Sequence, residues 1–153
     1  MSREFITSIL VTPNYANFSG VMHGGALVQI LDQVAYACAT KFCGVGTITM
    51  AINNASFIAP IQIGKILHLL ANVNYVGKTS LEIGIKAIAE DPKTGEKQHT
   101  NSAYFTMLAY ENGKKIEIKN SFLPETECEK RRWQNAIKRI DFSKNTISKA
   151  CEI

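Results

Sequence analysis

The chain has 153 residues, of which 46% are apolar and 20% are charged, and its net charge is +4. This size and composition predict a folded domain rather than a disordered chain, and the weak, scattered positive charge is compatible with an anionic small ligand but gives no support for nucleic-acid binding. Because a chain this short buries only about two-thirds of its extended surface alone, we expect it to associate with copies of itself.

The first third of the chain predicts a strand, a loop and a long helix. Residues 4–12 are expected to form the strand, and the loop runs from there to Gly24 and Gly25. Residues 26–42 contain no proline or glycine and have apolar side chains on nearly every side, which predicts a buried helix. Gly44 and Gly46 are expected to end this helix. No secretory signal opens the chain and no stretch is long enough to cross a bilayer, so we expect no membrane association.

The middle of the chain predicts four long strands. Apolar residues alternate along the second and third of them, and this alternation puts Tyr75 on the same face as Leu67, Leu69, Ala71 and Val73. The same pattern places Glu82 on the solvent side of its strand. The first of the four is rich in β-branched and small residues. The expected strands are residues 47–58, 65–76, 80–90 and 98–110, with turns at residues 91–95 and 112–113.

A second helix is predicted after Pro124. Thr126 and Glu129 have the spacing of a capping box, in which each side chain bonds the backbone N–H of the other residue. The thin apolar stripe that follows is typical of a helix on a surface, and it consists of Trp133, Ile137 and Ile140. From Asp141 the pattern loses its period, which predicts a loose tail over residues 141–153.

The order of these elements predicts an α+β fold. One strand, a long apolar helix, four strands and a surface helix are most simply arranged as an antiparallel β-sheet wrapped around the long helix. The chain shows no linker and no internal repeat, so we expect a single domain over residues 1–153.

Asp32 lies in the middle of the long apolar helix. A buried carboxylate is costly unless it is paired or used, which makes Asp32 a candidate for catalysis. The alternative is a partly exposed Asp32 on a polar stripe with Gln29, Gln33 and Tyr36. The residues themselves leave both interpretations open.

Gly24 and Gly25 precede this helix. Paired glycines let a ligand approach the backbone closely, and the first N–H groups of a helix have no internal partners. These N–H groups would suit the developing oxyanion of a thioester carbonyl under attack. A plain tight turn explains the glycine pair as well.

The spacing Asn-x6-Gly-Gly-x6-Asp, formed by Asn17, Gly24, Gly25 and Asp32, resembles the active-site segment of hotdog acyl-CoA thioesterases. The similarity covers most of the chain and continues in residues 48–53, 57–64, 77–82, 103–106 and 123–133. It is greatest to the brain-type acyl-CoA hydrolases and their bacterial single-domain relatives, and it implies the hotdog fold and hydrolysis of acyl-CoA.

The resemblance also implies roles for particular residues. Asp32 would be the catalytic carboxylate, acting as general base or as nucleophile, and Asn17 of a partner subunit would orient the water or the thioester. Each site would then be shared within a homodimer, and three dimers would form a hexamer. Lys78, Thr79 and Ser80 would lie near the pantetheine and phosphates of coenzyme A, although a solvated hairpin tip explains these three residues equally well.

Two other functions stay open as alternatives. A hotdog hydratase or dehydratase would need an acid–base pair, for which His23 and Asp32 are the candidates, but His23 is better explained by packing in the turn. A non-catalytic acyl-CoA-binding module would need neither Asn17 nor Asp32. His68 and His99 lie on strand patterns and are expected to be structural or exposed.

No group of residues has the spacing of metal ligands, so we expect no metal and no cofactor apart from the coenzyme A of the substrate. The four cysteines are Cys38, Cys43, Cys128 and Cys151. They fit no zinc or disulfide framework, and we interpret them as reduced thiols of a cytoplasmic protein.

Overall fold

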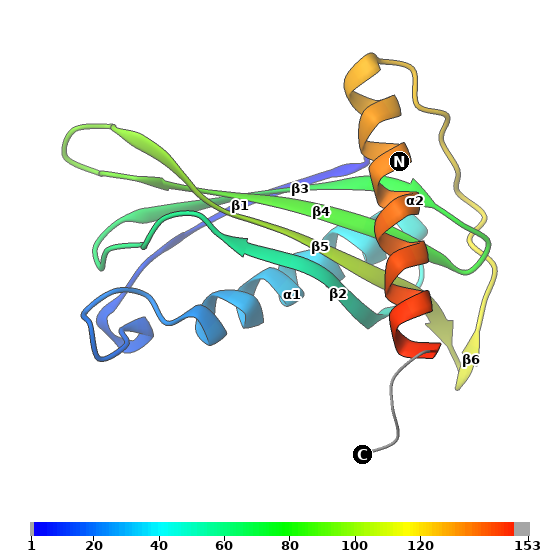
Figure 1. The fold of residues 1–153 in the computed structure, drawn as a ribbon, viewed down its shortest axis with the longest axis horizontal. Coiled ribbons are helices and arrows are strands. Elements are labelled where there is room, and N and C mark those ends of the chain that lie inside the picture. The colour runs from blue at the N-terminus through cyan, green and yellow to red at the C-terminus, as the bar shows by residue number, and fades with distance from the viewer. Residues whose placement is uncertain (1, 149–153) are drawn as a thin grey trace.

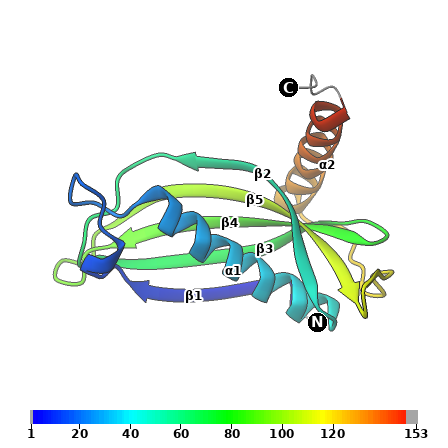
Figure 2. The same ribbon diagram turned by 90° about the horizontal axis from the view of Figure 1, so that it is seen from below.

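The computed structural model describes residues 2–148 and has one antiparallel sheet with a helix on each face (Figures 1 and 2). The elements are β1 (Glu4–Leu10), the 3-10 turn η1 (Pro13–Tyr15), α1 (Gly24–Cys43), β2 (Thr47–Phe57), β3 (Ile66–Val76), β4 (Ser80–Glu90), β5 (Lys97–Glu111), the short β6 (Lys114–Lys115) and α2 (Glu127–Ser148). The main strands are ordered β1-β3-β4-β5-β2. This arrangement confirms the predicted α+β hotdog fold, and each long strand ends within two residues of its predicted position.

Both ends of helix α1 are capped by residues that suit helix termini. It begins at Gly24, so the two glycines expected in the loop are its first two residues. His23 precedes it as the N-cap, and the backbone N–H of Gly25 donates to His23 Nδ1 at 2.9 Å. The helix ends at Gly44, whose left-handed φ of 73° lets its N–H reach the Thr40 carbonyl at 2.9 Å.

The core lies between α1 and the inner face of the sheet. Alternate residues of the central strands point toward α1 because side chains along a strand alternate between its two faces. The strand residues with no solvent exposure include Leu67, Leu69, Leu81, Ile83 and Phe105, and they meet Leu27, Leu31, Ala35 and Ala39 of the helix. Figure 2 shows α1 lying across this face.

The expectation that α1 is buried on all sides is wrong for the single chain. Gln29, Gln33 and Tyr36 are exposed, so the helix is covered on one side only. The neighbouring edge strand β2 also leaves large apolar side chains in solvent: Ile48, Met50 and Ile52 are each at least 45% exposed. The uncovered side of α1 and the edge of β2 form one surface, which we call the open face.

Glu82 was predicted to face solvent but has no solvent exposure. It does point to the outer face of the sheet, but α2 covers it there. Its carboxylate accepts hydrogen bonds from Arg139 of α2 at 2.6 and 3.1 Å, and from Asn53 and Asn74 at 3.3 Å each. The amide of Asn74 lies in the space that a side chain at Gly84 would fill, so the glycine makes room for this network.

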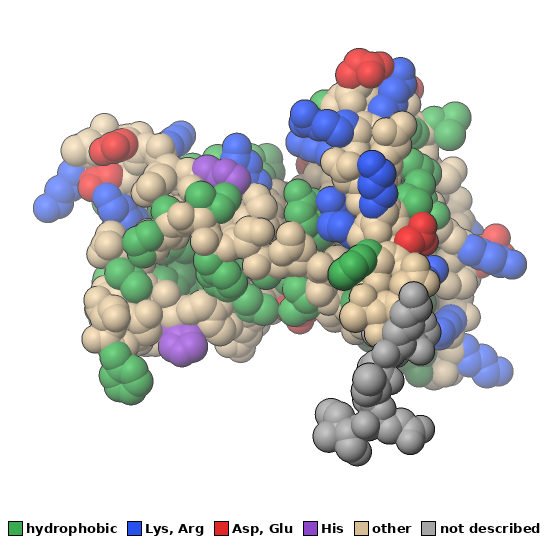
Figure 3. All heavy atoms as spheres, viewed as in Figure 1, with side chains coloured by type: hydrophobic (Ala, Val, Ile, Leu, Met, Phe, Trp, Pro, Cys, Tyr) green, Lys and Arg blue, Asp and Glu red, His purple; other side chains and the backbone are tan. Residues whose placement is uncertain are grey.

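Tyr75 also differs from its predicted orientation. The pairing of β3 with β4 shifts by one residue between Val73 and Tyr75. A bulge of this kind turns the following side chain to the other face, and the Tyr75 ring packs against Trp133 of α2 with centroids 4.8 Å apart. Helix α2 is thus a surface helix, as predicted, and Figure 3 shows Lys and Arg side chains gathered along it.

The sequence prediction was correct for the N-terminal end of α2 but not for its C-terminal part. Its capping box is confirmed, because Glu129 N–H donates to Thr126 Oγ1 at 3.2 Å and Thr126 N–H donates to Glu129 Oε2 at 3.1 Å. Its C-terminal part continues as regular helix through Asp141 to Ser148, where a loose tail was expected. The last part of that predicted tail, residues 149–153, lies outside the described residues.

Candidate active site

Asp32 lies on the open face, one residue from the buried Leu31. It is half-buried, so the polar-stripe interpretation describes its exposure correctly. Its carboxylate is nevertheless held in place, because Thr49 Oγ1 on β2 donates a hydrogen bond of 2.5 Å to Asp32 Oδ1. A carboxylate with one oxygen fixed by a hydroxyl and the other available can accept a proton or attack an electrophile.

Thr49 is the functional candidate that sequence reasoning missed. It belongs to a segment that carried the family resemblance, but no role was assigned to it. The contact depends on how α1 lies across β2, since the two residues are 17 positions apart on different elements. A strand pattern shows that Thr49 points to the inner face, but which helical residue it meets is decided by packing.

The N-terminus of α1 offers one fewer free donor than predicted. The N–H of Gly25 is already donated to His23 Nδ1, so of the two glycines only Gly24 has its N–H directed outward from the helix end. Gly24 packs against the Phe57 ring, which lies 3.3 Å from the position where a side chain would begin. The prediction of a two-glycine donor pair is therefore reduced to Gly24.

His23 acts as the cap of the helix, which agrees with the packing role favoured for it over that of a base. Its Nδ1 accepts the Gly25 hydrogen bond, so the neutral ring carries its proton on Nε2. Nine helical positions separate it from Asp32, which is about 13 Å along the axis. The two residues do not form the acid–base pair that a hydratase would need within this chain.

Asn17 lies in the loop before α1 and is held there by local bonds. Its side-chain oxygen accepts hydrogen bonds from the backbone N–H groups of Ser19 at 2.8 Å and Val21 at 3.3 Å. The loop is fastened in turn by a bridge between Val21 and Gln62. The amide nitrogen of Asn17 is thereby directed by a rigid turn, at the far end of the helix from Gly44.

Asp32 and the loop residues are not brought together within one chain. Eight helical positions separate Gly24 from Asp32, a distance of about 12 Å along the axis. Asn17 lies beyond Gly24, since the loop turns away from the helix toward Gln62. No hydrogen bond joins Asn17 to Asp32 among the described residues.

The turn formed by residues 78–80 lies near the other end of the sheet. Thr49 and Leu81 both pair with Met107, so the turn begins about 10 Å from Thr49, two strand spacings across the sheet. Lys78 is exposed, and the three residues line a cavity of about 260 Å³ against Ile137 and Lys144 of α2. This cavity is on the outer side of the sheet, so it is separate from both Asp32 and Gly24.

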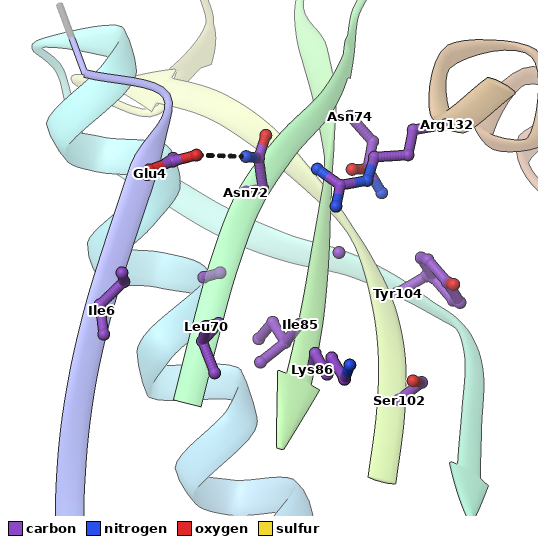
Figure 4. Close-up of a pocket in the computed structure, with 12 residues that line it drawn as sticks. Glu4, Ile6, Leu70, Asn72, Asn74, Ile85, Lys86, Ser102, Tyr104 and Arg132 are labelled. Carbon is purple, nitrogen blue, oxygen red and sulfur yellow. Dashed lines mark hydrogen bonds between the residues drawn. The ribbon is translucent and has the colours of Figure 1, made fainter. Parts of the chain in front are cut away.

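A cavity of about 190 Å³ opens beside the N-terminus of α1. Its lining is mostly apolar, with Gly24 and Asn101 as the exceptions. A larger cavity, of about 350 Å³, lies on the outer face between the strands and Arg132 of α2 (Figure 4). We place the candidate active site at α1 rather than in this larger cavity, because the predicted catalytic groups are all on the α1 side.

The described part of the chain was also compared with the requirements of a metal site and of a membrane-spanning helix. Within residues 2–148, no group of three or more His, Cys, Asp or Glu side chains is arranged to hold a metal ion. In the same part of the chain, no helix is long and apolar enough to span a membrane.

Comparisons with known proteins point to one family. The model of the thioesterase superfamily matches residues 19–96. Protein VdlD of Helicobacter pylori is 50% identical over 136 residues, which cover 89% of this chain and 78% of that protein. A hexameric acyl-CoA thioesterase, solved in its apo form, superposes with a TM-score of 0.90 and 28% identity over 97% of this chain and 95% of that one.

The acyl-CoA hydrolase of Staphylococcus aureus, solved with butyryl coenzyme A and coenzyme A, is also similar, with a TM-score of 0.85 and 26% identity over 94% of this chain and 87% of that one. Variants of that enzyme with an asparagine, an aspartate or a threonine replaced by alanine have been solved. In that enzyme the aspartate follows the asparagine by 15 positions, and the threonine follows the aspartate by 17 positions. Asn17, Asp32 and Thr49 are separated by the same two intervals in this chain. The comparisons confirm the resemblance found in the sequence.

Proposed function

Because this chain belongs to the thioesterase superfamily, we propose that it hydrolyses acyl-coenzyme A to a free acid and coenzyme A, with Asp32 as the catalytic carboxylate. The observation that carries this proposal is the 2.5 Å hydrogen bond from Thr49 to Asp32 on the open face. It fixes the carboxylate on a surface that a large thioester can reach. A hydratase is less well supported, since His23 is occupied as a helix cap.

Asp32 can act by either of two routes. As general base it takes a proton from water while the water oxygen attacks the thioester carbonyl; the intermediate then collapses, the C–S bond breaks, and the thiolate takes up the proton. As nucleophile it forms an acyl anhydride and releases the thiolate, and water then cleaves the anhydride. In both routes Thr49 orients the carboxylate, and no metal ion takes part.

We propose that each site is shared between two subunits. The oxyanion that forms at the carbonyl needs a donor within hydrogen-bond distance, yet Gly24 is about 12 Å from Asp32 of its own chain. A two-fold pairing of open faces would set the helices antiparallel and bring Gly24 and Asn17 of one subunit toward Asp32 and Thr49 of the other.

The open face is suited to this pairing. It carries the unpaired edge of β2 and the exposed side chain of Ile52, which a second copy would bury. We propose further that three such dimers form a hexamer in the cytoplasm, as in the hexameric relative, and that residues 78–80 contact the coenzyme A of the substrate.

Subunit mixing tests the proposal. Asn17→Ala and Asp32→Ala proteins, each inactive alone, are dissociated, combined and reassembled. A mixed dimer has one site with both residues and one with neither, and half of randomly formed dimers are mixed, so about a quarter of wild-type activity should return. Absence of recovery after demonstrated subunit exchange would show that each subunit builds its own site. Thiol release that persists after exhaustive chelation would support a metal-free reaction.

A further inference from the structure

We infer that helix α2 forms a second contact between the two subunits of the dimer, in which the Phe142 rings of both subunits meet on the outer face of the joined sheet. This contact rests on the proposed function, because it follows from the pairing of open faces that the shared site requires. It lies on the opposite side of the sheet from Asp32 and takes no part in the reaction itself.

Helix α2 crosses the outer face and continues past its edge. The Trp133 ring packs on Tyr75 of β3 with centroids 4.8 Å apart, and six positions later Arg139 lies 3.6 Å from the centroid of the Tyr104 ring of β5. Six helical residues advance about 9 Å, and β5 is two strand spacings, about 10 Å, from β3. One further spacing brings α2 to β2 at about residue 142. The residues that follow lie beyond this edge strand, where Figure 2 shows the end of α2 projecting.

The projecting end of α2 stays helical although its own chain leaves it largely uncovered. The helix is regular to Ser148, and Phe142 is 73% exposed. Short helical ends are marginal in water without tertiary packing, and an exposed aromatic ring gains free energy when a second surface covers it. A partner subunit at this end would account for both features.

The contacts of Arg139 show in which direction Phe142 points. Arg139 binds β4 in the row of paired residues that ends at Ala51 of β2. Its guanidinium extends over Tyr104, in the row that ends at Asn54. Phe142 follows three positions later and is therefore on the same side of the helix. It points along β2, from Ala51 toward Asn54.

The proposed shared site sets the position of the two-fold axis. Thr49 binds Asp32, and Gly24 packs against the Phe57 ring at the other end of β2. Bringing Gly24 of one subunit to Asp32 of the other therefore sets Phe57 of one β2 opposite Thr49 of the other. The middle of such an antiparallel pair is at about Asn53, four positions from each.

The two α2 helices then run antiparallel on the outer face, one on each side of the axis. Each Phe142 points from its own helix toward the axis, so the two rings meet there and shield each other from water. Because the contact is isologous, every substitution at residue 142 changes it on both sides at once.

Cysteine cross-linking tests this arrangement. The parent protein carries Cys128→Ser and Cys151→Ser, the latter because Cys151 lies outside the described residues, and it keeps the two buried cysteines. Phe142→Cys in this parent should form a covalent dimer with a short bifunctional maleimide, because the two thiols face each other across the axis. The control Lys144→Cys should remain a single chain on a denaturing gel, since Lys144 is exposed on the opposite side of α2.

Dissociation on dilution gives a second readout. Phe142→Asp removes both rings and sets two like charges at the axis, so it should raise the dissociation constant of the dimer by about tenfold or more. The control Leu123→Asp changes an apolar residue that is 82% exposed before the other end of α2, and it should leave this constant unaltered. Sedimentation over a dilution series measures both constants. Far-UV circular dichroism should be unchanged in Phe142→Asp, because the ring is exposed in the single chain.

The activity of Phe142→Asp separates a lost contact from a damaged site. Its thiol release per subunit should fall on dilution and return to the wild-type value at high protein concentration, whereas Asp32→Ala should stay inactive throughout. Absence of the covalent dimer, an equal yield from Lys144→Cys, or equal dissociation constants for Phe142→Asp and Leu123→Asp would each overturn the contact and leave the proposed function standing. A wild type that hydrolyses acyl-CoA as a monomer would overturn the contact and the shared site together.

Discussion

Arg139→Met should cause a large loss of stability, because it removes the partner of a buried charge. Glu82 is completely buried, and the guanidinium of Arg139 gives it the two shortest of its hydrogen bonds, at 2.6 and 3.1 Å. The guanidinium also lies 3.6 Å from the centroid of the Tyr104 ring. Without it, the carboxylate would keep only the 3.3 Å bonds from Asn53 and Asn74.

The magnitude follows from the cost of a buried charge left without its partner, which is about 3–5 kcal/mol. For a chain of this length each kcal/mol lowers Tm by about 2–4 °C. Arg139→Met should therefore lower Tm by about 10 °C. Adding Glu82→Gln should restore more than half of the loss, because a neutral amide has no charge to bury and still accepts the bond from Asn74.

Thermal unfolding followed by far-UV circular dichroism measures both effects, and size-exclusion chromatography reports whether assembly is kept. Arg132→Met is the matched control, since Arg132 is exposed on the same helix and its loss should change Tm little. The reasoning is refuted if Arg139→Met lowers Tm no more than the control does. It is also refuted if Glu82→Gln deepens the loss of Arg139→Met instead of reversing it.

Three further outcomes are expected. Thr49→Val should lower kcat by about tenfold or more, which corresponds to the loss of one hydrogen bond to a charged group. Thr49→Ser keeps the hydroxyl and should stay close to the wild-type kcat. Equal kcat values for the two variants would show that the Thr49 hydroxyl does not assist Asp32. The backbone N–H groups of the capping box, with Arg3 adding to them, hold the pKa of Glu129 at about 2, below its usual 4.5. This stabilisation is complete above pH 4.5 and is lost as the pH falls toward 2, so the Tm difference between wild type and Glu129→Gln should shrink over that range, and a difference that is constant from pH 7 to 2 would contradict the assignment. Burial raises the pKa of the Cys38 thiol to about 12, so this thiol should react slowly with an aromatic disulfide reagent. Compared with the wild type, Cys128→Ser should have one rapidly reacting thiol fewer, and Cys38→Ser should have the same number.

The strands and helices could be predicted from the sequence because their signals are local. Alternation along β4 and the spacing of Thr126 and Glu129 depend on neighbouring residues, and both were correct about the elements they define. Glu82 was placed wrongly because its partner is 57 positions away on a helix whose position on the sheet no local pattern reveals. Tyr75 was placed wrongly because a single bulge reverses an otherwise regular alternation.

The features of the candidate site also fall into two groups, those that local sequence spacing predicts and those that depend on packing between elements. Asp32, Asn17 and Gly24 became candidates because of their spacing along the chain. The Thr49 contact and the occupied N–H of Gly25 depend on how the folded chain packs, so a one-dimensional pattern does not contain them. The burial of α1 was overestimated because Gln29, Gln33 and Tyr36 lie together along one side of the helix, and the single chain leaves that side exposed.

Association of copies at the open face should affect both the stability and the activity of the protein, so both should depend on protein concentration. A folded chain that presents the edge of β2 and the bare side of α1 to water has free energy to gain from every copy that covers them. Since the proposed catalytic groups lie on that surface, dilution should lower activity and Tm together, and substrate that bridges two subunits should raise both. If the site is shared as proposed, protein concentration would control the activity of the enzyme without a separate regulatory site.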